Sequence, residues 1–370
     1  MKPRAITGIG TASAFGVGWA AFLEGMRDGK PASAIDGKVE VPGFDPTKYL
    51  GDKGLRSLDR LTKLLVVSSR LALHEAGLKR EGAWTGVTGE DVGIVVSNAY
   101  GSLEAIAELH KVATLEDARY INPSRFPLTV ANSAAGYASI WEDIRALNVS
   151  VCDGNCGGLD ALACADAMLE QRRAKAILVG GVESMSEPLH VAFQRLAVAG
   201  ESATLGEGAG IVALETMEGA AARSAQVLAQ AVGYGTYFSP PDGDATLLHP
   251  STEAMEQAIA GALADAGASP RDVDVVVSGV SGLRAFDEAE LVAVARALGD
   301  PWVIAPKLAL GETLGAGGAL GMLAAIAVLR DGAKSYGVRG TVRTQPRTAL
   351  VTCLGYYGNA SALVMRAHSG

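Results

Sequence analysis

The 370-residue chain is predicted to fold as an α/β protein made of two similar halves that share one core. Short buried β-like runs alternate with helical runs along the whole chain, which is typical of a sheet covered by helices. The alternation restarts near residue 220, and each part contains a strand, a small-residue loop and a helix before it closes on two strands. Because no Pro-, Ser- or charge-rich linker separates 1–219 from 220–370, we expect the halves to pack intimately.

The composition favours a globular protein with a large core. Hydrophobic residues make up 49% of the chain and charged residues 19%, with a net charge of −8. No basic stripe is present, so nucleic acid is not an expected partner. The uncharged stretch from Ala5 to Leu23 is interrupted by four glycines, which favours a strand, a loop and a helix over a signal peptide or membrane segment. We expect a cytoplasmic protein that does not associate with membranes.

Cysteine and histidine usage argues against a metal site. The four cysteines have no CxxC spacing and the five histidines are scattered, so we expect reduced thiols, no zinc and no disulfide framework. The runs GEGAG and GAGGALG lack the residues that follow a phosphate-binding loop or a dinucleotide fingerprint. No cofactor is therefore predicted.

In the first half, strands and helices alternate from the start. The helix predicted at 58–77 carries apolar residues three and four apart, and Gly77 reads as its C-terminal cap. Loops are expected at 121–130, which two prolines interrupt, and at 188–196. Strands are predicted at 4–9, 91–98, 148–151, 175–184 and 209–216, and helices at 18–28, 58–77, 102–112, 131–144 and 159–169.

The second half repeats this order. A Pro- and Gly-rich loop is expected at 239–250, and the stretch 311–332 is glycine-rich. Strands are predicted at 226–235, 272–281, 302–310, 348–358 and 360–366, and further helices at 252–267 and 288–299.

The stretch 145–169, RALNVSVCDGNCGGLDALACADAML, has the organisation of an acyl-transfer site. A strand at 148–151 leads through a turn of small residues into a helix. A side chain at that turn would lie at a helix N-terminus, where the macrodipole and free N–H groups favour an anion such as a thiolate.

Motifs along nearly the whole chain resemble the β-ketoacyl-acyl-carrier-protein synthase family of the thiolase superfamily. They follow one another in the family's order and include AITGIG, NPSRFPLTVANSAAG, ILVGGVES, GEGAGIVALE, PKLALGETLGAGGALG and LGYYGNASALV. The resemblance implies a thiolase-like fold, in which two similar halves form a five-layered α-β-α-β-α sandwich, and it implies a dimer.

The activity implied by the resemblance is a decarboxylative condensation that uses a cysteine and two histidines. The cysteine position of the family falls on Asn155, and Cys156 lies one residue too late. The first histidine position falls on Val280, or on Gly279 if a gap is placed differently. The family's usual nucleophile and this histidine are therefore absent.

The third motif of the family keeps its scaffold but not its histidine. Lys307 is retained, whereas Glu312 occupies the histidine position, and we expect these two residues to form a buried ion pair. The matching scaffold residues are Gly311, Gly315, Ala316 and Gly318.

Two further departures concern the pocket. The loop before GEGAG is shortened to AVAGESATL, and Tyr356 and Tyr357 stand where the family keeps a gating phenylalanine and a glycine. We expect these two rings to fill or reshape the acyl cavity.

The resemblance and these losses favour a non-catalytic ketosynthase-like subunit, similar to a chain-length factor, that pairs with an active ketosynthase and meets an acyl carrier protein. Decarboxylation with Asn155 in place of the cysteine is disfavoured, because that reaction needs the missing histidines. One alternative is a condensing enzyme with its chemistry relocated to Cys156, whose pKa Lys307 could lower. Another is a homodimer that binds an acyl chain or small molecule without turnover.

Overall fold

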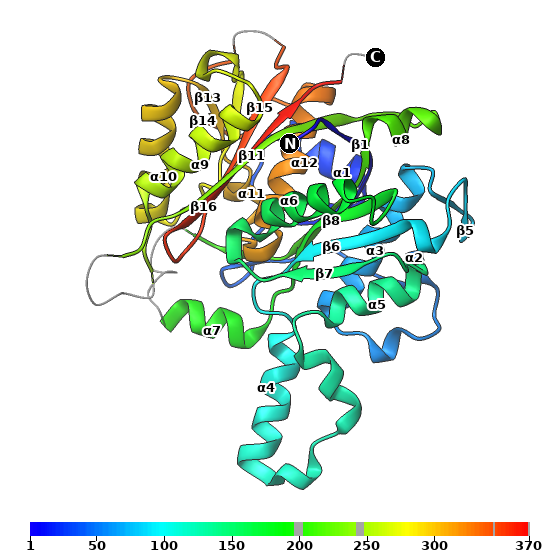
Figure 1. Ribbon diagram of the computed structural model, residues 1–370. Coiled ribbons are helices and arrows are strands. Elements are labelled where there is room, and N and C mark those ends of the chain that lie inside the picture. Colours follow the sequence, from blue (N-terminus) through cyan, green and yellow to red (C-terminus); the bar gives the residue numbers. More distant parts are fainter. Residues whose placement is uncertain (196–202, 242–247, 343–344, 369–370) are drawn as a thin grey trace.

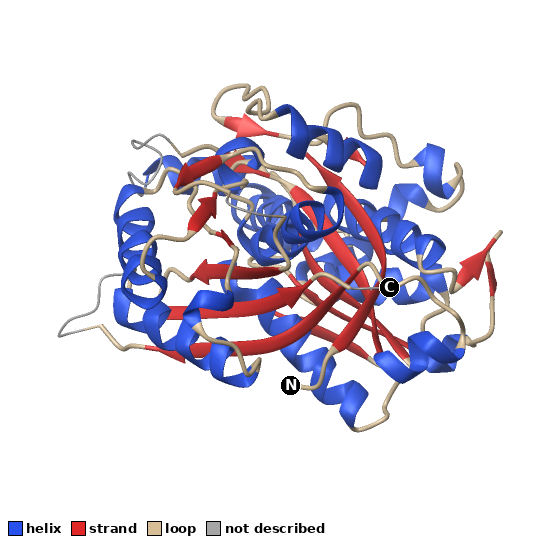
Figure 2. Ribbon diagram, turned by 90° about the horizontal axis from the view of Figure 1, so that it is seen from above, coloured by secondary structure: helices blue, strands red, loops and turns tan. Residues whose placement is uncertain are grey.

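The computed structural model describes residues 1–195, 203–241, 248–342 and 345–368 (Figure 1). Strands run through the molecule and helices lie on both of their faces (Figure 2).

The first half contains a five-stranded mixed sheet with the order β7-β6-β8-β10-β1. Strand β6 runs parallel to both β7 and β8, whereas β10 runs antiparallel to β8 and to β1. The strands are β1 (Arg4–Ser13), β6 (Val92–Ser97), β7 (Asn148–Val151), β8 (Ala176–Glu183) and β10 (Gly208–Thr216).

The second half repeats this topology, with the order β13-β12-β15-β16-β11 and the same strand directions. Strand β14 (Gly337–Arg339) extends its outer edge. A short antiparallel seam over Arg4, Ala5 and Ile6 joins β1 to β11. The strands are β11 (Ala229–Phe238), β12 (Val275–Val277), β13 (Trp302–Ile304), β15 (Thr348–Leu354) and β16 (Asn359–Arg366).

The helices complete five layers. Helices α6 (Gly157–Glu170) and α12 (Gly317–Asp331) lie between the two sheets, α3 (Arg60–Glu75) and α5 (Ser133–Glu142) cover the outer face of the first sheet, and α9 (Thr252–Asp265) and α10 (Arg284–Leu298) cover the outer face of the second. The predicted thiolase-like arrangement of two similar halves is thus confirmed.

Small residues allow the two central helices to approach closely. A Cβ atom on Gly158 would lie 2.5 Å from the backbone nitrogen of Ala319, so α6 and α12 touch through their backbones. Both helices are buried along most of their length and share one apolar core with the inner faces of the two sheets. Glycine and alanine in these helices therefore set the spacing of the middle layer.

The remaining elements lie outside this core. Helix α4 and the irregular turns after it form a lobe that projects from the body (Figure 1). The lobe consists of α4 (Leu103–Val112), a π turn (Ala113–Asp117) and two 3-10 segments (Ala118–Tyr120 and Pro123–Thr129). The other helices are α1 (Trp19–Asp28), α2 (Thr47–Leu50), α7 (Glu187–Arg195), α8 (Met217–Ala222) and α11 (Lys307–Leu310). The short strands are β2 (Gly16–Val17), β3 (Lys38–Val39), β4 (Lys79–Arg80), β5 (Ala83–Trp84) and β9 (Leu205–Gly206).

Several sequence predictions about secondary structure differ from the structure: the loop expected at 121–130 is largely a 3-10 segment, and the strand expected at 272–281 spans only Val275–Val277. The loop expected at 188–196 is largely helix α7, because Leu189 and Phe193 are four residues apart and both bury on one face. The strand expected at 302–310 ends at Ile304, because Pro306 begins the short helix α11. The boundary expected between residues 219 and 220 falls inside α8 and stays a prediction.

Among the described residues, one helical stretch, Leu314–Asp331, is long and apolar enough to cross a membrane. It is 83% buried inside the protein, where it forms the middle layer. Its apolar composition is explained by this position in the core.

Candidate functional site

The residues singled out from the sequence converge where the two central helices begin. Asn155 lies in a 3-10 turn (Gly154–Cys156) before α6, Glu312 lies between α11 and α12, and Tyr356 follows the end of β15. A Cβ atom on Gly318 would lie 3.4 Å from the carbonyl oxygen of Asn155, so the two helix starts are in contact. Because α6 and α12 occupy equivalent positions in the repeated topology, the fold itself brings these segments together.

Asn155 is buried at the position where the sequence predicts loss of the nucleophile. Its side chain is 4% exposed, and Nδ2 donates to the Leu354 carbonyl oxygen at 3.4 Å. Its Oδ1 has no hydrogen-bond partner in the part of the chain that the structure describes. A carboxamide cannot form the thioester that the family's cysteine forms.

Cys156 is fully buried and held as a thiol. Its Sγ lies 3.3 Å from the Cys353 carbonyl oxygen, to which it donates. Burial, with the nearby negative charge of Asp160, raises the pKa of Cys156 well above its usual value. The interpretation in which Lys307 lowers the pKa of this thiol finds no support, because Lys307 pairs with Glu312.

Lys307 and Glu312 form the ion pair expected from the sequence. Lys307 Nζ donates to Glu312 Oε1 at 2.7 Å, and the backbone N–H of Leu314 donates to the same oxygen at 2.9 Å. Burial disfavours the charged lysine, but the Glu312 carboxylate outweighs burial and the pKa of Lys307 is raised. The lysine therefore remains a cation that holds one oxygen of Glu312.

Val280 contributes only apolar surface, and its side chain is 5% exposed. Gly279, the alternative position for the first histidine, donates its backbone N–H to Glu290 Oε1 at 2.7 Å. Neither residue has a side chain that could stabilise an oxyanion. The structure thus places no imidazole where the sequence comparison expects the first histidine.

Glu290 is a buried carboxylic acid that the sequence analysis missed. Thr352 Oγ1 donates to its Oε1 at 2.6 Å, and burial raises its pKa to about 7. A signal was present, because Glu290 lies three and four residues before the buried Ala293 and Val294 and so shares their face of α10.

Tyr356 fills the site, whereas Tyr357 does not. Tyr356 is 5% exposed, and its ring makes edge contacts with Phe286 at 5.2 Å and Phe193 at 6.4 Å between centroids. Tyr357 is 52% exposed and lies at the surface. Of the two rings expected to fill or reshape the acyl cavity, Tyr356 is therefore packed into the centre, whereas Tyr357 lies outside it.

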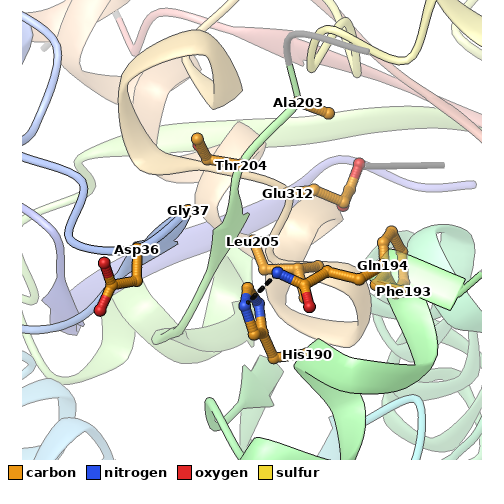
Figure 3. A pocket seen from close by; sticks show the side chains of 9 residues that line it. All are labelled: Asp36, Gly37, His190, Phe193, Gln194, Ala203, Thr204, Leu205 and Glu312. Carbon is orange, nitrogen blue, oxygen red and sulfur yellow. Dashed lines mark hydrogen bonds between the residues drawn. The ribbon is translucent and has the colours of Figure 1, made fainter. Parts of the chain in front are cut away.

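A cavity of about 340 Å³ lies beside this centre, and Glu312 forms part of its wall (Figure 3). His190, Phe193 and Gln194 of α7 line it on one side, and Gln194 Nε2 lies 2.9 Å from His190 Nε2. The sequence pattern does not indicate this cavity, because the segment that forms α7 is predicted to be a loop. Among the described residues, no group of three or more His, Cys, Asp or Glu side chains is arranged to hold a metal ion.

Comparisons with known proteins agree along the whole chain. The family models for the β-ketoacyl synthase N-terminal and C-terminal domains match residues 1–220 and 228–335. A putative polyketide β-ketoacyl synthase 2 from Streptomyces halstedii is 30% identical, and the match covers 98% of this chain and 96% of that protein. The 3-oxoacyl-acyl-carrier-protein synthase 2 of Coxiella burnetii is 28% identical, with 88% and 85% covered.

A solved structure, the ishigamide ketosynthase/chain length factor, matches with a TM-score of 0.87 and 22% identity over 100% of both chains. At this identity the match shows the fold alone.

Proposed function

The chain belongs to the β-ketoacyl synthase family, and on that premise we propose that it is a non-catalytic, chain-length-factor-like subunit. In this role it pairs with an active ketosynthase in polyketide or fatty-acyl biosynthesis and shares that enzyme's acyl carrier protein.

The observation that carries the proposal is the chemistry of three side chains. Asn155, Val280 and Glu312 occupy the positions that the resemblance assigns to the cysteine and the two histidines. An amide, an alkyl group and a carboxylate already bound to Lys307 provide no nucleophile, and a carboxylate would repel a developing enolate. Tyr356 is also packed into the centre. The chain therefore keeps the scaffold of the family but lacks the side chains that the condensation uses.

Cys156 does not offer a replacement nucleophile. A reactive cysteine needs a lowered pKa and access to its substrate. The pKa of Cys156 is instead raised, and its side chain is 0% exposed. We therefore favour the partner-subunit role over relocated condensing chemistry.

Two features of the first half support pairing with another subunit. Strand β7 forms the outer edge of its sheet, with a hydrogen-bonded neighbour on one side only among the described strands. Large apolar side chains are exposed on the projecting lobe and on the nearby α5, among them Leu115, Tyr120, Phe126 and Ile140. An open strand edge beside exposed apolar side chains is typical of an interaction surface.

The proposal is tested by co-expressing this chain with candidate active ketosynthases and a carrier protein. We expect a stable heterodimer that makes product, whereas this chain alone neither condenses acyl groups nor shows an acyl adduct by intact-mass spectrometry. Condensing activity of the chain alone would overturn the proposal. The alternative would be supported if this chain formed a homodimer that does not bind the ketosynthase and that retains a ligand through purification.

A further inference from the structure

The ring of Tyr356 is held in place by several other elements. Phe286 of α10 and Phe193 of α7 contact the ring edge-on, and Leu314 belongs to the same buried apolar cluster. The Tyr356 backbone is fixed as well, because its carbonyl oxygen accepts a hydrogen bond from the His249 backbone N–H at 2.7 Å. The side chain therefore has a defined position at the centre of the site.

The hydroxyl of Tyr356 lies beside the residues at two of the three positions that the resemblance assigns to catalysis, the Glu312 carboxylate and the Asn155 carboxamide. Lys307 and the Leu314 backbone both bind Glu312 Oε1, which leaves Oε2 for another donor. Oε2 and Tyr356 Oη are buried, and neither has a hydrogen-bond partner elsewhere among the described residues. Leaving either atom unpaired is costly, so a bond between them is favoured.

The surroundings keep the phenol of Tyr356 protonated. Burial and the Glu312 carboxylate raise the pKa of Tyr356 well above its usual value. A protonated phenol can donate to a carboxylate, whereas a phenolate would be repelled by it. The hydroxyl oxygen also has lone pairs that can accept from the Asn155 amide. One hydroxyl therefore suits both neighbours, as a donor to one and an acceptor from the other.

We propose that the centre is a binding site for a phenol and that the chain fills it with its own Tyr356 side chain. The hydroxyl donates to Glu312 Oε2 and accepts from the Asn155 carboxamide, while the ring lies against Phe193 and Phe286. The contact is autoinhibitory, because it closes the centre to an acyl chain and ties the start of α6 to the end of β15. This inference does not depend on the pairing with a ketosynthase.

A double-mutant cycle tests the hydroxyl. Tyr356→Phe keeps the ring, and in urea it should raise the equilibrium constant for unfolding about tenfold or more. In the background Lys307→Met/Glu312→Leu, where the carboxylate acceptor is missing, the same change should have an effect of only about twofold. Tyr357→Phe at an exposed position is the matched control and should have little effect in either background. Equal effects of Tyr356→Phe in both backgrounds would overturn the proposal.

Small ligands test the chemistry of the site. Tyr356→Ala empties it, and the probes are phenol and benzene, which differ by one hydroxyl. Saturation-transfer NMR and isothermal titration calorimetry should show phenol binding to this variant about tenfold more tightly than benzene, with neither bound by the wild type or by the control Tyr357→Ala. Equal binding of the two probes, or no binding to the folded variant, would overturn the proposal. If Tyr356→Ala does not fold, the cycle with Tyr356→Phe still decides it.

Discussion

Lys307 Nζ and Glu312 Oε1 are 2.7 Å apart, and their side chains are only 6% and 1% exposed. Each charge is costly to bury by itself, and each is tolerated because the other lies within hydrogen-bond distance. The pair occupies the positions that the resemblance assigns to a lysine and a histidine, and each of its two charges is balanced by the other.

Removing one partner of this pair should destabilise the fold strongly. We expect Lys307→Met to lower the free energy of unfolding by about 3–5 kcal/mol, because Glu312 would stay buried without its counter-charge. The double variant Lys307→Met/Glu312→Leu should regain most of that loss. Urea unfolding followed by circular dichroism measures both.

The control is the surface pair of Arg296 and Glu256, whose side chains are 66% and 30% exposed. Arg296→Met should cost about 1 kcal/mol or less. If Lys307→Met cost no more than Arg296→Met, the buried pair would have no special role in stability.

Cysteine alkylation distinguishes a buried packing thiol from a relocated nucleophile. In native protein at pH 8, iodoacetamide should modify Cys152, which is exposed, and leave Cys156 unmodified, because Cys156 is fully buried and its pKa is raised. Peptide mass spectrometry gives the modified fraction at each site. Protein unfolded in urea serves as the control, in which all four cysteines should react; rapid native alkylation of Cys156 would restore the relocated-chemistry hypothesis.

Sequence patterns were sufficient for the fold because its determinants are local and repeated. The buried runs that become β6 and β8 and the small residues that become α12 are visible without any structure. The pairing of β1 with β11 is different, since the sequence contains no signal that links Arg4 to Ala231. That contact depends on how the two folded halves pack against each other.

The sequence predicts which residue types lie at the candidate site. It does not predict the direction in which each side chain points. The resemblance to the family's motifs singles out Asn155, Lys307 and Glu312, and the ion pair between the last two follows from their charges. Tyr356 is buried and Tyr357 is exposed because their side chains point in different directions beyond the end of β15. The cavity requires α7 to be placed against β9, a tertiary contact that no local pattern contains.

Asp160 should make stability depend on pH. It accepts hydrogen bonds from Tyr234 Oη and Ser361 Oγ, both at 2.6 Å, and burial together with Asp153 raises its pKa to about 7. The folded state therefore holds a proton that the unfolded chain releases near pH 4. Stability should fall as pH rises from about 4 to 7, by at most about 1.4 kcal/mol per pH unit for this group.

The variant Asp160→Asn removes this titration and keeps an acceptor for both hydroxyls. Urea unfolding at pH 5, 6, 7 and 8 should show a smaller loss of stability with pH than in the wild type, while Glu290, whose pKa is also raised to about 7, still contributes. Asp52→Asn at an exposed position is the control. Parallel pH profiles for wild type and Asp160→Asn would show that Asp160 is ionised in the folded protein.

The proposed pairing surface can be tested at Ile140 on α5. Its side chain is 75% exposed, and α5 packs beside the open edge strand β7. Burying a new carboxylate in an apolar interface is costly, so Ile140→Asp should weaken association with a partner ketosynthase about tenfold or more. The isolated chain should keep its melting temperature, because Ile140 does not contribute to the core. Sedimentation velocity at several concentrations gives the dissociation constants.

Phe238→Asp is the matched control, since Phe238 is 57% exposed at the end of β11 in the other half. It should leave association unchanged. If Phe238→Asp weakened pairing as much as Ile140→Asp did, the surface beside β7 would not be the interface. If neither variant had an effect, the exposed side chains of α5 would need another explanation.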